Sequence, residues 1–440
     1  MPRDEVARDS IAAIATPSGR GGIGIVRISG ADVPRIARRV LGELPAPRIA
    51  TLRPFLDASG DKLDEGIALY FPPPHSYTGE PVLELQGHGG PVVMQSVLAA
   101  CLDAGARLAE PGEFTRRAFL EGKLDLAQAE AVADLIDAAS REAARSAMRS
   151  LNGEFSAAID ALVAQLVELR ALTEAMLDFP EEEVDLVHRE DAAARLAHVQ
   201  RQLDEVLAKS REGSLLRSGI HVVLAGRPNV GKSSLLNRLA GEERAIVTPI
   251  AGTTRDALRE PIQIQGVPLT VVDTAGLRAA ADMIEQLGIE RTQRELAQAD
   301  LVLVIREAGE TGSTIAGLPV GVRQLEVYNK ADLAPRFKAP PGAIVVSAKT
   351  GHGLDELRAA ILTAAGWSST GESVFLARER HLRALESARG HLDAAGKQLP
   401  RWEFFAEELR LAHAALGAIT GEFTADDLLG EIFSRFCIGK

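Results

Sequence analysis

The chain has 440 residues, of which 46% are hydrophobic and 25% charged, a balance typical of folded proteins of about three domains. This composition excludes a disordered chain and a collagen, and two cysteines are too few for a disulfide scaffold. The formal charge of −12 means that any contact with nucleic acid needs a local basic patch or a partner chain. No apolar run approaches the roughly 18–20 residues that span a bilayer, and the acidic, proline-containing start is unlike a signal peptide. We therefore expect a cytoplasmic protein with no membrane segment.

Glycine and proline are distributed unevenly along the first half of the chain. Residues 1–119 are rich in both and carry short β-type runs at 23–28, 67–71 and 82–85, which predicts an α+β domain. Residues 120–215 contain few of either. Their helix-compatible segments, 123–152, 154–179 and 181–212, predict the first part of an all-α helical domain.

The second half begins with alternating strand-like and helix-like segments. In residues 216–371, almost wholly apolar runs lie at 220–225, 269–272, 301–305, 325–328 and 344–347. Such runs are typical of a parallel sheet covered on both faces, so this part is predicted to be a doubly wound α/β domain. Residues 372–440 return to a helical pattern. The multidomain prediction is therefore an α/β domain inserted into one helical domain, although two separate helical domains would give the same pattern.

A phosphate-binding motif lies at the start of the α/β segment. Residues 226–233, GRPNVGKS, match GxxxxGK[ST] between a strand-like and a helix-like run, which is the context that the motif requires. Glycines let backbone N–H groups turn toward phosphate oxygens, the lysine supplies charge for the β- and γ-phosphates, and the serine hydroxyl can bind Mg²⁺. The predicted contacts are Gly226, Asn229, Val230, Gly231, Lys232, Ser233 and Ser234.

Three later motifs indicate guanine as the base. Asp273-Thr-Ala-Gly276 places a carboxylate near Mg²⁺ and an amide near the γ-phosphate. In Asn329-Lys-Ala-Asp332 the last carboxylate can accept from N1–H and the 2-amino group of guanine, donors that adenine lacks. Ser347-Ala-Lys349 supplies a further base-side loop, and Thr254 is a candidate second Mg²⁺ ligand on a switch segment. Together the motifs resemble a Ras-like P-loop GTPase domain, with contacts predicted at Thr254, Asp273, Gly276, Asn329, Lys330, Asp332, Ser347, Ala348 and Lys349.

The expected hydrolytic residues depart from the Ras pattern. Ras-like proteins carry a water-orienting glutamine after this aspartate motif, whereas this chain has Leu277, whose apolar side chain cannot orient water. Glu285 and Glu290 are the nearby carboxylate candidates. No arginine finger can be assigned, so another group must neutralise the charge that develops between the β- and γ-phosphates.

Several segments make the resemblance specific to one family. The phosphate loop GRPNVGKSSLLN, the switch TPIAGTTRD, the terminal FCIGK and the N-terminal GRGGIGIVRISG, LELQGHGG and PGEFTRRAFLEGKLDLAQAEAVADLI resemble the bacterial tRNA-modification GTPase family MnmE, also called TrmE. The resemblance covers nearly the whole chain. It implies a folate-binding N-terminal domain, a helical domain split by the G domain, and a homodimer. It also implies that, with an FAD-containing partner, the protein adds an aminomethyl-type group to C5 of the wobble uridine of certain tRNAs.

The resemblance also implies roles for particular residues. Glu285 matches the catalytic glutamate that acts on the attacking water, and Ser233 and Thr254 match the Mg²⁺ ligands. The one-carbon donor is a tetrahydrofolate derivative in its 5-formyl or methylene form. The K⁺ site and its nucleotide loop are matched by Asn229, Thr248, Ile250 and Thr253, and the folate site by Arg27, Glu84, Lys123 and Lys440.

A second class of function fits many of the same motifs. A regulatory or assembly GTPase would use the G domain as a timer, and its other domains would only bind RNA or the ribosome. Such proteins typically append a compact basic module, whereas this chain is acidic and ends in an acidic-rich helical segment. The folate-type motifs favour the modification enzyme.

Overall fold

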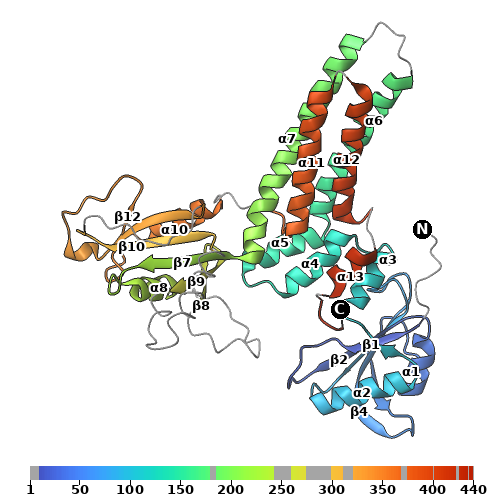
Figure 1. Ribbon diagram of the computed structural model, residues 1–440. Coiled ribbons are helices and arrows are strands. Elements are labelled where there is room, and N and C mark those ends of the chain that lie inside the picture. Colours follow the sequence, from blue (N-terminus) through green and yellow to red (C-terminus); the bar gives the residue numbers. More distant parts are fainter. Residues whose placement is uncertain are drawn as a thin grey trace, which may run out of the picture. The chain divides into compact units, whose positions relative to one another are not determined.

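The protein is described here by a computed structural model, and its parts divide into two compact units (Figure 1). The first unit comprises Met1–Ala133 with Gly417–Lys440, and the second comprises Asp134–Leu416. The structure describes residues 9–178, 185–241, 259–273, 299–310, 321–367, 374–399, 401–422, 426–434 and 436–439. Among these residues, none of the helices has the length and apolar character that crossing a membrane would require.

The first unit contains a six-stranded sheet in the order β3-β4-β5-β2-β1-β6. Its strands are β1 (Ile11–Ile14), β2 (Gly24–Ser29), β3 (Thr51–Leu56), β4 (Lys62–Phe71), β5 (Val82–Gly87) and β6 (Arg107–Leu108). All neighbours are antiparallel except β1 and β6, which are parallel. The strands predicted at 23–28, 67–71 and 82–85 are confirmed as β2, β4 and β5. The other three were missed because β1 and β6 are very short and β3 contains a proline.

Side-chain alternation gives this sheet two different faces. Val26 and Leu85 are buried under helices α1 (Val33–Leu41) and α2 (Pro91–Asp103), in one continuous hydrophobic cluster. Arg27 and Glu84, which are paired in register, point to the opposite face. Because successive residues of a strand alternate between faces, this charged pair lies opposite the large cluster, near a smaller hydrophobic cluster that includes Ile11, Ala13 and Phe114. The face that carries the charged pair is here called the polar face.

The C-terminal part of the chain completes the first unit. Leu126 and Ala129 of α4 (Leu126–Ile136) pack with Phe433 of α13 (Asp426–Ser434), beside α3 (Glu113–Leu120). After α13, Ile438 forms an isolated antiparallel bridge with Pro111. The two ends of the sequence therefore build one unit.

The second unit contains a helical bundle, in which α6, α7, α11 and α12 run alongside one another (Figure 1). Its helices are α5 (Arg141–Leu151), α6 (Glu154–Asp178), α7 (Asp185–Ser218), α11 (Glu379–Gln398) and α12 (Trp402–Thr420), of which the residues after Leu416 belong to the first unit. The predicted single segment 123–152 is wrong, because it forms two helices, α4 and α5. The hydroxyl of Ser140 accepts a hydrogen bond of 3.1 Å from the backbone N–H of Ala143, so this side chain caps a new helix.

A second six-stranded sheet, in the order β12-β11-β10-β7-β9-β8, forms the α/β part of this unit. Its elements, together called the G domain, are β7 (Ile220–Gly226), α8 (Lys232–Ala240), β8 (Arg259–Ile264), β9 (Val267–Asp273), β10 (Leu301–Glu307), β11 (Arg323–Asn329), η2 (Ala331–Leu333), β12 (Ile344–Val345) and α10 (Leu354–Ala365). All five predicted strands are confirmed, and the pairings among these five are parallel. The missed strand, β8, is an antiparallel edge strand that contains Pro261. The multidomain fold class predicted from the sequence is thus confirmed.

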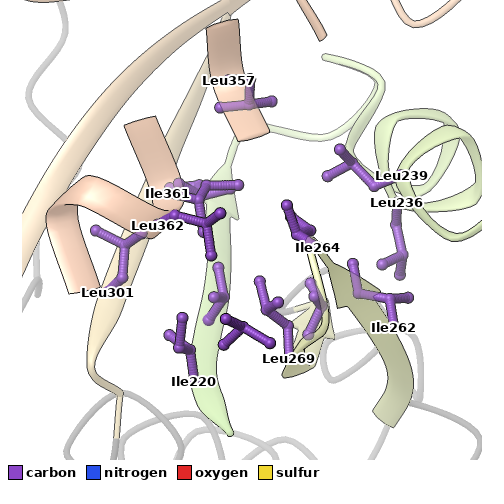
Figure 2. Close-up of a cluster of buried hydrophobic side chains, with 14 of the residues drawn as sticks. Ile220, Leu236, Leu239, Ile262, Ile264, Leu269, Leu301, Leu357, Ile361 and Leu362 are labelled. Carbon is purple, nitrogen blue, oxygen red and sulfur yellow. The ribbon is translucent and has the colours of Figure 1, made fainter. Parts of the chain in front are cut away.

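Aliphatic side chains from the sheet and from its helices make the core of the G domain (Figure 2). Ile220, Leu269 and Leu301 come from the sheet, Leu239 from α8 and Ile361 from α10. Because β7, β9, β10 and β11 are parallel, their carboxyl ends share one edge of the sheet, which is where ligands bind in open α/β folds.

Candidate functional site

The predicted phosphate loop connects the buried strand β7 to helix α8. The loop turns at Gly231, whose φ of +91° lies in the left-handed region. A Cβ atom at this position would also lie 2.4 Å from the side-chain nitrogen of Asn329. Glycine is therefore required at position 231 both by the backbone conformation and by the close approach of a second loop.

Lys232 begins α8 and is only 4% exposed. Its Nζ donates hydrogen bonds to the backbone carbonyls of Gly226 at 3.0 Å and Arg227 at 2.9 Å. The ammonium group thus lies over the loop, at a helix N-terminus whose partial positive charge also favours anions. A phosphate bound here would meet both charges.

Asn329 joins the phosphate loop to the predicted base-side loop. Its buried side chain donates from Nδ2 to the carbonyl of Val230 at 2.9 Å. Its Oδ1 accepts from the backbone N–H of Ala348 at 3.1 Å. The side-chain amide of Asn329 therefore bonds to two loops that are far apart in the sequence and holds them next to each other.

The carboxylate predicted to select guanine is held by a neighbouring hydroxyl. Ser347, which is fully buried, donates from Oγ to Oδ1 of Asp332 at 2.7 Å, whereas Asp332 itself is an exposed residue. Lys330 has a φ of +63° and pairs through Nζ with Glu307 at 2.7 Å. The sequence did not indicate Glu307, whose carboxylate holds the side chain of this predicted nucleotide-binding lysine.

Two of the residues predicted to lie near Mg²⁺ are within the described part of the chain. Asp273 is the last residue of β9, and its backbone is in register with Leu224, two residues before the phosphate loop begins. Ser233 is exposed on the first turn of α8. A carboxylate and a hydroxyl at these places suit Mg²⁺, which prefers oxygen ligands.

Several predicted residues lie outside the part that the structure describes, and their roles stay predictions. They are Thr248, Ile250, Thr253, Thr254, Gly276, Glu285 and Lys440. Of the remaining nucleotide residues, Ser234 and Lys349 are exposed, on α8 and on the base-side loop.

The first unit holds a second group of predicted residues. Nε and NH2 of Arg27 both lie 2.9 Å from Oε1 of Glu84. The guanidinium also lies 5.3 Å from the ring centroid of Tyr77 and 5.9 Å from that of Phe114. Neither ring was predicted, because each comes from a different segment and only the fold brings it to Arg27.

Two further contacts shape this group. The hydroxyls of Tyr77 and Thr115 are 2.8 Å apart, and burial raises the pKa of the Tyr77 phenol despite this bond and the nearby Arg27. Lys123 donates from Nζ to the carbonyl of Pro74 at 3.1 Å, so it touches the same loop that carries Tyr77. The result is a charged pair beside aromatic rings on the polar face of the sheet.

The phosphate loop, the strand-end aspartate and the two base-side loops share one edge of a parallel sheet, and this arrangement defines a P-loop GTPase domain. Comparison with protein families adds the flanking parts. The model for the MnmE helical domain matches residues 126–437, and the model for the GTP-binding protein TrmE N-terminus matches residues 10–123. The chain belongs to the MnmE (TrmE) family.

Similar curated proteins extend over almost the same length. The tRNA modification GTPases MnmE of Azoarcus sp. and Thiobacillus denitrificans are each 60% identical to this chain, and in each case 98% of both chains is covered. Among solved structures, the FeoB G-domain from Methanococcus jannaschii is 26% identical, covers 33% of this chain and 96% of its own, and gives a TM-score of 0.25. The family membership thus rests on whole-length relatives.

Proposed function

We propose that this chain uses GTP hydrolysis to drive the addition of an aminomethyl-type group to C5 of the wobble uridine of certain tRNAs. The coarser statement, a GTPase acting in tRNA modification, follows from the family, whose whole-length relatives are named tRNA modification GTPases. The observation that supports the GTPase part of the proposal is the joining of the predicted phosphate loop and base-side loop by Asn329.

At the nucleotide, the chain's own residues bind and orient the substrate. Lys232 and the N-terminus of α8 hold the β- and γ-phosphates, and Asp332 pairs with the guanine edge. Mg²⁺ would be held by Ser233 and Thr254, with Asp273 nearby, and when bound it neutralises charge on the phosphate oxygens. Glu285 is proposed to orient the attacking water, because Leu277 cannot.

A monovalent cation site is proposed beside the phosphates. Asn229 is exposed and left-handed in the phosphate loop, with a φ of +64°, and within the described part of the chain its amide makes no hydrogen bond. It therefore offers an oxygen to K⁺, together with the proposed ligands Thr248, Ile250 and Thr253. The bound cation would supply positive charge at the place where an arginine finger acts in related enzymes.

The polar face of the N-terminal sheet is the proposed site of the tetrahydrofolate derivative, in its 5-formyl or methylene form. A pterin edge carries adjacent N–H donors that suit the Glu84 carboxylate, and flat rings such as Tyr77 suit a flat ligand. Lys123 and Lys440 would bind the acidic tail. Gly439, the last described residue, approaches Ile14 of β1, which supports including the C-terminal lysine.

Three features of the proposal concern the setting of the enzyme. The chain is proposed to act as a homodimer, with an FAD-dependent partner, in the cytoplasm. We propose tRNA as the substrate because the similar curated proteins are named tRNA modification GTPases.

The test of this function is nucleoside analysis of tRNA from cells that lack the protein. We expect the C5-substituted wobble uridine to disappear, and to return when the full chain is supplied but not when Lys232→Ala is supplied. Unchanged tRNA nucleosides together with a ribosome-assembly defect would favour the regulatory GTPase instead.

Glu84→Gln should weaken folate binding by about tenfold or more, because the amide loses charge-assisted hydrogen bonds to the ligand. Calorimetry with 5-formyltetrahydrofolate measures this, and GTP affinity should not change. Glu65→Gln, on the neighbouring strand β4, is a matched control, since that exposed side chain pairs only with Lys62 among the described residues. An intact protein that binds no folate would reject the site.

A further inference from the structure

Each of the two connections between the G domain and the helical bundle carries an arginine that bonds to the same buried carboxylate. Asp134, near the end of α4, is 5% exposed at its side chain. Its Oδ1 accepts from Nε of Arg217 at 2.9 Å and from NH2 of Arg378 at 2.8 Å. Arg217 lies in the last turn of α7, just before β7, and Arg378 immediately precedes α11. These three residues are called the Asp134 cluster.

The two connections also touch each other beside this cluster. A Cβ atom at Gly213 would lie 1.7 Å from the carbonyl oxygen of Phe375, so the two backbones are in direct contact. Ser146 of α5 donates from Oγ to the carbonyl of Val374 at 2.9 Å. Leu216 and Leu376 are buried in the same hydrophobic cluster as the start of β7. The described parts of the two connections, residues 213–218 and 374–378, therefore form a packed collar.

The helix that carries Asp134 also belongs to the core of the first unit. Leu126 and Ala129, in its first turn, pack with α13, whereas Asp134 lies two turns further along. The boundary between the two units falls within this helix. Because a helix is stiff over such a length, a displacement at one end reaches the other.

We propose that Asp134 is a positioning residue that couples the nucleotide state of the G domain to helix α4. A change in the G domain that moves either connection must move an arginine bonded to Asp134 or break that bond. Breaking either bond is unfavourable, since the Asp134 carboxylate is only 5% exposed and accepts from these two arginines among the described residues. The proposed coupling depends on the proposed function in one respect only: it would transmit the nucleotide state of the G domain to the parts of the enzyme that carry out the tRNA chemistry.

Hydrogen exchange of the α4 backbone amides in the full-length protein tests the coupling, with GDP and a non-hydrolysable GTP analogue compared. In the unmodified protein, we expect α4 exchange rates to differ between the two states by about fivefold or more. Asp134→Asn should abolish this difference and leave GTP affinity within about twofold. Asp134→Glu, which keeps the charge, should restore part of it. Asp137→Asn is the matched control, because Asp137 is exposed in the same region and no described residue bonds to it.

A second variant covers the case in which Asp134→Asn does not fold. Arg217→Gln removes one arm of the cluster at a side chain that is 40% exposed, and it should reduce the α4 response. No response of α4 in the unmodified protein would overturn the proposal, as would a full response in both Asp134→Asn and Arg217→Gln. These measurements need neither tRNA nor folate, so their failure is distinct from failure of the proposed tRNA chemistry.

Discussion

Replacing Asp332 by asparagine is expected to weaken GTP binding by roughly two to four orders of magnitude and to make xanthosine triphosphate the preferred nucleotide. The carboxylate can accept from both N1–H and the 2-amino group of guanine, and each charge-assisted bond contributes about 1.5–3 kcal/mol. An amide presents a donor where the 2-amino group requires an acceptor. Xanthine carries a carbonyl at that position, so it complements the amide.

Competition binding with both nucleotides checks this exchange of specificity. Asp355→Asn is the matched control, because that carboxylate is 98% exposed at the start of α10 and pairs only with Arg358 among the described residues. Ser347→Ala should weaken GTP binding less, since it removes only the bond that orients Asp332. Unchanged GTP affinity in Asp332→Asn would show that the base is recognised elsewhere.

The second large effect concerns the salt in the assay. Replacing KCl by NaCl is expected to lower GTP turnover by about two orders of magnitude or more, because a positive charge at the developing negative charge is worth roughly 10³–10⁵ when an arginine supplies it. Na⁺ is smaller than K⁺ and fits an oxygen cage built for K⁺ poorly. No arginine finger can be assigned in the sequence, so hydrolysis is expected to depend on such a charge.

A steady-state GTPase assay in the two salts measures this dependence. Asn229→Ala should remove the difference between the salts and spare nucleotide affinity, whereas Asn237→Ala, exposed later in α8, should behave like the unmodified protein. Light scattering with a transition-state mimic should show K⁺-dependent pairing of G domains, because the proposed cation site and the proposed pairing of two copies would be linked. Equal rates in KCl and NaCl would contradict the proposed cation site.

The almost wholly apolar strands of the parallel sheet in the G domain were predictable from the sequence, and the mixed strand β8 of the same sheet was not. The run at 301–305 is buried on both faces, so its composition alone identifies β10. β8 holds Arg259, Glu260 and Pro261 and lies at the edge, where such residues are tolerated. The break between α4 and α5 was missed because residues around Ser140 are common in helices, and the capping bond identifies it only in three dimensions.

The residues of the candidate site also differ in how far the sequence could predict them. Phosphate-loop residues are contiguous, so their chemistry could be predicted from spacing alone. The bond from Asn329 to Val230 joins residues 99 positions apart, and Asp134 meets Arg378 across 244 positions. No local pattern marks such pairs, because either partner alone has the character of an ordinary polar residue on a helix or loop.

The collar at the two connections also has a consequence for how the chain folds. The whole G domain lies in the sequence between the bundle helices α7 and α11. If it were an unfolded loop, bringing these two helices together would cost conformational entropy that rises with the length of the loop. A G domain that has already folded holds Ile220 and Trp367, at its two ends, in one hydrophobic cluster, and the flanking segments touch at Gly213 and Phe375. The helices α7 and α11 therefore meet as though a short turn joined them. We therefore expect the G domain to fold first and the helices on either side of it to pack into the bundle afterwards.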